Sequence, residues 1–64
     1  MNPSDIRTLR RSMHLTQAQL AERLGVTRHS VCRWEHPSGR WPINPTAARL
    51  LLTLHSRYRA VDLF

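Results

Sequence analysis

Three side chains able to bind a polyanion, and one cysteine, lie close together in the middle of the chain. Arg28 and Cys32 are four residues apart, and His29 and Arg33 have the same spacing. At the period of an α-helix, two such pairs form neighbouring ridges on one face. The arginine fork can donate two hydrogen bonds to a phosphate or to the O6 and N7 atoms of guanine. The spacing therefore indicates a helical face that can contact nucleic acid.

The charge of the whole chain favours the same kind of partner. Ten basic residues, all of them arginine, stand against four acidic residues, which gives a net charge of +6. Such an excess of positive charge attracts polyanions. Codon usage in a GC-rich genome would also favour arginine over lysine, but it does not explain the net charge.

Length and composition argue against several other classes of protein. The 64 residues suit one domain, residues 1–64, with a small core and modest stability. The single cysteine, Cys32, excludes an internal disulfide and argues against a metal site or other cofactor. It also suits a reducing compartment such as the bacterial cytosol. No apolar run approaches the ~20 residues of a membrane span. We therefore expect a cytoplasmic protein without a membrane anchor.

Histidines raise the question of an enzyme: His14, His29, His36 and His55. The middle of the chain adds only two carboxylates, Glu22 and Glu35. Their spacing matches none of the short motifs that bind a catalytic metal or a nucleotide phosphate. We expect no catalytic activity.

Apolar residues around the basic face predict two short helices, residues 17–24 and 28–35. Leu20 and Leu24 share one face of the first helix, and Val31 and Trp34 share one face of the second. Gly25 falls where the first helix ends, in a position that often requires a left-handed backbone. Two helices that cross steeply at a short turn containing glycine form a helix-turn-helix motif.

This stretch resembles the phage repressor and Cro-like helix-turn-helix family, a group of small bacterial and phage transcription regulators. The matching residues are Gln17, Leu20, Ala21, Leu24, Gly25, Val26, Val31, Trp34 and Glu35. The resemblance extends more weakly over residues 5–54. It implies an all-α, compact repressor-like domain of four to five helices, in which the second helix of the motif enters the major groove of double-stranded DNA.

Two further helices complete the expected domain, over about residues 3–13 and 45–57, with a possible short turn at 60–63. Residues that can cap helices precede all four: Asn2 or Ser4, Thr16 with Gln19, Thr27, and Asn44 with Pro45. Residues 36–44 contain two prolines and a glycine and are expected to form a loop.

The resemblance assigns base contacts to the outward face of residues 28–35, namely Arg28, His29, Cys32 and Arg33. Either arginine can read guanine or hold a phosphate without reading a base. Cys32 either contacts a thymine methyl group or is merely tolerated at its position.

Phosphate contacts are expected from Arg10, Gln17, Thr27, Ser30, Arg40, Trp41 and Asn44. Gln17 stands where the family has a phosphate-contacting glutamine, and Arg40 supports a loop that follows the DNA backbone. Trp41 either packs against a sugar or closes the core. The resemblance also implies an ion pair between Arg10 and Glu35, whereas Arg7 and Arg11 are expected on a solvated face.

The C-terminal part carries more apolar surface than a small core needs. The expected dimer interface comprises Leu50, Leu52, Tyr58, Val61, Leu63 and Phe64, although the tail could equally fold over its own core. A homodimer would bind an inverted repeat in its operator and repress its own small operon. The alternative is an antitoxin-type module whose apolar tail engages a toxin or another partner protein from the same operon.

Overall fold

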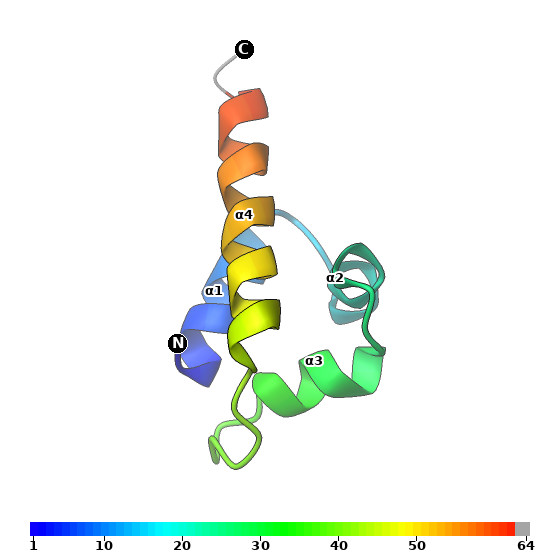
Figure 1. Ribbon diagram of the computed structural model, residues 1–64, viewed down its shortest axis with the longest axis vertical. Helices are drawn as coiled ribbons and strands as arrows, with labels where there is room; N and C mark the ends of the chain where they lie inside the picture. Colours follow the sequence, from blue (N-terminus) through cyan, green and yellow to red (C-terminus); the bar gives the residue numbers. More distant parts are fainter. Residues whose placement is uncertain (63–64) are drawn as a thin grey trace.

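The computed structural model describes the backbone of residues 1–62 and the side chains as far as residue 59. The described part is all-α, with four helices in the order α1 (Pro3–Ser12), α2 (Gln17–Leu24), α3 (Arg28–Trp34) and α4 (Pro45–Asp62). In Figure 1, α3 lies across the lower end of α4, and the C-terminal half of α4 extends beyond the other helices. Within this part, no helix combines the length and apolar character that a membrane span requires.

The last helix differs from the prediction. It was expected to end near residue 57, with a separate turn at 60–63, but α4 continues without a break to Asp62. Neither glycine nor proline occurs between residues 46 and 62. Nothing in the sequence therefore stops the intrahelical hydrogen bonds from propagating. The described chain accordingly has four helices, within the expected four to five.

Each helix starts after a residue that was predicted to cap it. Asn2, rather than Ser4, caps α1, since its Oδ1 accepts a hydrogen bond of 2.8 Å from the backbone N–H of Asp5. The other caps are Thr16 with Gln19 for α2, Thr27 for α3 and Asn44 for α4. Each cap satisfies a backbone donor that has no partner within its helix. These bonds link neighbours in the sequence, and helix starts were therefore readily predicted.

Every helix contributes to one small core. Its buried members are Ile6, Met13, Leu20, Ala21, Leu24, Val31, Trp34, Ala47 and Leu51. The turn between α2 and α3 is made by Gly25, whose φ of 72° lies in the left-handed region as predicted. This turn brings Val31 of α3 against the side chains of α2 in the core, where Val31 and Leu20 are both fully buried. The core thus fixes which face of α3 is left in solvent.

Adjacent leucines on α4 test this core directly. Leu51 is completely buried, whereas Leu52 is 51% exposed. We expect Leu51→Ala to lower the free energy of unfolding by about 2–5 kcal/mol, because it leaves a cavity. The same change at Leu52 should alter it by less than about 0.5 kcal/mol. Urea denaturation measures both, and equal effects would contradict the placement of α4.

Candidate nucleic-acid interface

The outward face of α3 gathers the side chains that were predicted to contact bases. Arg28, His29, Cys32 and Arg33 are all exposed. The opposite side of the helix carries Val31 and Trp34, which are only 0% and 8% exposed. No acidic residue interrupts the exposed face, since Glu35 follows the helix and is buried. Packing of Val31 and Trp34 in the core therefore leaves a face with basic and no acidic side chains in solvent.

The start of α3 brings together two residues expected to contact phosphate. Thr27 accepts a hydrogen bond of 3.2 Å from the backbone N–H of Ser30. The hydroxyls of Thr27 and Ser30 are also 3.1 Å apart and share a hydrogen bond. Both hydroxyls are therefore held at the N-terminus of α3, beside its first turn. A contact of either residue with phosphate remains a prediction.

The ion pair between Arg10 and Glu35 is present in the structure. The Nε atom of Arg10 lies 2.7 Å from Oε2 of Glu35, and its Nη2 atom lies 3.0 Å from Oε1. The remaining terminal nitrogen, Nη1, donates to the carbonyl oxygen of Leu15 at 2.9 Å. Glu35 is 2% exposed, and the carboxylate therefore needs these partners. All three Arg10 nitrogens thus have partners within the protein, but two of the five N–H donors are left, and the expected phosphate contact stays a prediction.

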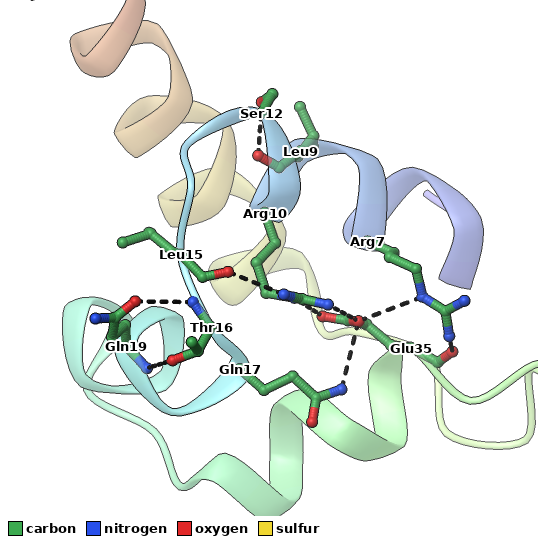
Figure 2. Close-up of polar contacts among 9 residues, drawn as sticks. All are labelled: Arg7, Leu9, Arg10, Ser12, Leu15, Thr16, Gln17, Gln19 and Glu35. Carbon is green, nitrogen blue, oxygen red and sulfur yellow. Dashed lines mark hydrogen bonds and ion pairs between the residues drawn. The ribbon is translucent and has the colours of Figure 1, made fainter.

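Glu35 also attracts two residues that were not expected to reach it. Figure 2 shows Arg7 from α1 and Gln17 from α2 converging on the same carboxylate as Arg10. The Nε atom of Arg7 lies 3.6 Å from Oε1, and Nε2 of Gln17 donates to this oxygen at 3.4 Å. Arg7 was assigned to a solvated face, but it lies one helical turn before Arg10 and so shares its side of α1. The three-residue spacing between Arg7 and Arg10 could therefore have predicted that Arg7 also reaches Glu35.

Glu35 also affects the ionisation of Arg10. Its hydrogen bond to the carboxylate raises the pKa of the Arg10 guanidinium, with a smaller opposing effect from burial. A raised pKa means that Arg10 loses its charge, and the pair its stability, only as the pH rises into the strongly alkaline range. The link between α1 and the end of α3 therefore persists throughout the neutral range.

The loop after α3 carries the remaining aromatic residue of the site. Trp41 is partly buried, but it is not among the residues that pack against the core. Trp41 therefore does not close the core, whereas Ile43 packs against it, and the expected contact of Trp41 with a sugar stays a prediction. The guanidinium carbons of Arg33 and Arg40 lie 5.4 and 5.9 Å from the centre of its ring. Trp41 thus connects the loop to the exposed face of α3.

Comparison with known families agrees with this geometry. Residues 6–37 match the model of the Helix-turn-helix family. The chain belongs to the phage repressor and Cro-like helix-turn-helix family. No curated protein and no solved structure matches it significantly. Membership supports a DNA-binding transcription regulator at the general level.

Histidines of this helix-turn-helix domain are dispersed rather than clustered. His29 lies on α3, and His36 lies in the loop with its ring edge-on to Trp41 at 5.3 Å. His14 is in the link after α1, where its ring is 6.4 Å from that of Tyr58. In the described part of the chain, no three histidine, cysteine, aspartate or glutamate side chains are placed to hold a metal ion.

Only some of the predicted dimer residues can be placed. Leu50 and Leu52 are 47% and 51% exposed on α4. Tyr58 instead packs partly against the core of its own domain. The side chain of Val61 and both Leu63 and Phe64 lie outside the described residues. The exposed large apolar side chains that the structure describes on α4 are therefore Leu50 and Leu52, which lie on different sides of the helix because they are two residues apart.

A double-mutant cycle tests the link between α1 and α3. We expect Arg10→Met and Glu35→Leu each to destabilise the fold, because each leaves a charge without its main partner. The double variant should be more stable than the sum of the two losses predicts, with a coupling of about 0.5–3 kcal/mol. Arg11→Met, at an exposed position of the same helix, is the control. Additive free energies of unfolding would show that the pair contributes no coupling.

Proposed function

We propose that this protein is a sequence-specific transcription regulator that inserts α3 into the major groove of double-stranded DNA. The observation that carries the proposal is the division of α3 into two faces. One face buries Val31 and Trp34, and the other exposes Arg28, His29 and Arg33. In a helix-turn-helix protein, the second helix of the motif reads base edges from this position. Arginine forks suit guanine, which presents two acceptors in the major groove.

Residues around α3 would hold the protein on the DNA backbone. We assign phosphate or sugar contacts to Gln17, Thr27, Ser30, Arg40, Trp41 and Asn44. These contacts supply affinity that decreases with added salt, but they carry little sequence information. Gln17 and Asn44 keep part of their amide groups for this role, since each makes one side-chain hydrogen bond within the described protein.

The proposed regulator acts as a homodimer on an inverted repeat and represses its own small operon. Support comes from Leu50 and Leu52, which leave apolar surface exposed on α4. A twofold dimer would place two α3 helices about 34–36 Å apart, on successive major grooves. A second candidate uses the same surface of α4 differently. It is an antitoxin-type module that binds a partner protein there.

The base-reading role of α3 is tested with two arginines that differ only in location. Arg28 lies on the outward face of α3, whereas Arg23 lies at the end of α2 beside Leu54 and Arg57 of α4. Binding is measured at ~150 mM salt on a duplex selected from random sequence, where specific affinity should exceed non-specific affinity at least about a thousandfold. Arg28→Ala should cost about 1–3 kcal/mol and relax the preference at one base pair.

Arg23→Ala removes the same charge and should leave that preference unchanged. An equal, sequence-independent loss in both variants would contradict base reading by Arg28. If the unmodified protein selects no sequence at all, the proposed function fails.

Sedimentation equilibrium at micromolar concentration tests the homodimer. We expect Leu52→Glu to shift the protein toward monomer, because it places a charge in an apolar interface. Thr8→Glu adds the same charge at an exposed position on α1 and should leave association unchanged. If the unmodified protein is a strict monomer, the homodimer is excluded and the second candidate gains support.

A further inference from the structure

The indole of Trp41 lies among three basic side chains. Arg33 of α3 and Arg40 of the loop both place their guanidinium groups over its ring, at 5.4 and 5.9 Å. The ring of His36 meets it edge-on, at 5.3 Å and 90°. This cluster, Arg33, His36, Arg40 and Trp41, joins a residue of the exposed α3 face to the loop that follows it.

Hydrogen bonds within the loop hold the indole in place. The Nδ1 atom of His36 lies 2.9 Å from the hydroxyl of Ser38, which also accepts a bond from the backbone N–H of Arg40 at 3.2 Å. The backbone N–H of Gly39 donates to the carbonyl of His36 at 3.1 Å, and Gly39 has a φ of 67°. Ile43, two residues beyond Trp41, packs against the core. Contacts therefore restrain the loop both before and after Trp41 in the sequence.

A contact with an aromatic ring restrains an arginine without using its hydrogen-bond donors. The attraction is between the cation and the electrons of the ring face. The N–H donors lie at the edge of the guanidinium group. Within the described residues, Arg33 makes no salt bridge and no side-chain hydrogen bond. By contrast, all three side-chain nitrogens of Arg10 donate to Glu35 or Leu15. Arg33 is thus restrained while its fork stays available.

We propose that Trp41 is a positioning residue for base recognition, which holds Arg33 so that its fork meets a guanine in the major groove. The inference rests on the proposed function and names the residue that sets one of its specific contacts. A free arginine side chain loses much rotational entropy when it is fixed in one geometry. By restraining Arg33 before DNA binds, Trp41 removes part of that entropy loss. The resulting gain in affinity appears only where the fork finds both acceptors of guanine. Arg40, on the same ring but in the loop, holds phosphate instead.

Base preference must be measured as well as affinity, because only base preference tells whether Trp41 positions Arg33 or supports DNA binding in general. Dissociation constants are determined for the selected duplex and for duplexes with each base pair changed in turn. Arg33→Ala identifies the base pair that Arg33 reads. Trp41→Leu should lower discrimination at that same pair by about two- to fivefold. Trp41→Phe keeps a ring face and should restore most of the discrimination.

Two further variants complete the design. Arg40→Ala touches the same indole, and we expect it to weaken binding to all duplexes equally. In the Arg33→Ala background, Trp41→Leu should produce no further loss of discrimination at that pair. If Trp41→Leu leaves discrimination unchanged, or weakens all duplexes equally, the proposal is overturned even though the protein still selects a sequence.

A measurement without DNA distinguishes this failure from a failure of the proposed function. In the free protein, the ring current of Trp41 should shift the Cδ protons of Arg33 upfield in NMR spectra. Trp41→Leu should abolish the shift, and Trp41→Phe should retain part of it. Absence of the shift in the unmodified protein overturns the positioning role, whatever the protein does with DNA. A shift that is present in a protein without sequence preference overturns the proposed function, and the inference with it.

Discussion

The buried carboxylate of Glu35 is the constraint on which the DNA-facing surface depends. Glu35 is the C-cap residue of α3, and its carboxylate receives side chains from both α1 and α2. A charge that is 2% exposed is stable only with partners, and Arg10 provides two short hydrogen bonds. The direction of α3 is therefore tied to two other helices by a contact with strict geometry, in addition to the apolar core. Apolar packing alone tolerates small rotations, whereas a bidentate ion pair does not.

Arginines of this chain have different roles because their surroundings differ. Arg7 and Arg10 face the one buried carboxylate, and their positive charge is used within the protein. Arg28 and Arg33 lie on an exposed face that has no acidic residue, so their donors face solvent. Arg33 is nevertheless restrained, by a ring rather than by an acid. Arginine thus forms ion pairs within the protein on α1, whereas on α3 it is the candidate residue for base recognition.

The long last helix, α4, also has buried and exposed faces. Leu51 lies in the core, while its neighbours Leu50 and Leu52 are about half exposed. The C-terminal half of α4 also extends past the other helices (Figure 1). Only one face of this half can pack on its own domain, at Leu54 and Tyr58. The other described faces of this half carry exposed polar side chains, at Ser56, Arg57 and Arg59.

The sequence by itself determined the helices and their starts. Caps, the glycine turn and apolar spacing act over three or four residues, so Thr16, Gly25 and Thr27 could be read locally. The family motif also located the Arg10–Glu35 pair and the four residues on the outward face of α3. The end of α4 was missed, because no breaker residue marks it.

Only the tertiary structure decided which side chains share a partner. Arg7 and Gln17 reach Glu35 across 28 and 18 positions of sequence. Trp41 is not part of the core, and its ring instead meets the guanidinium group of Arg33 from α3. Such contacts depend on how helices and loops are packed in space, and several sequence patterns can satisfy them equally well. Local spacing therefore specified the elements and the exposed face, whereas packing specified the network that holds this face in position.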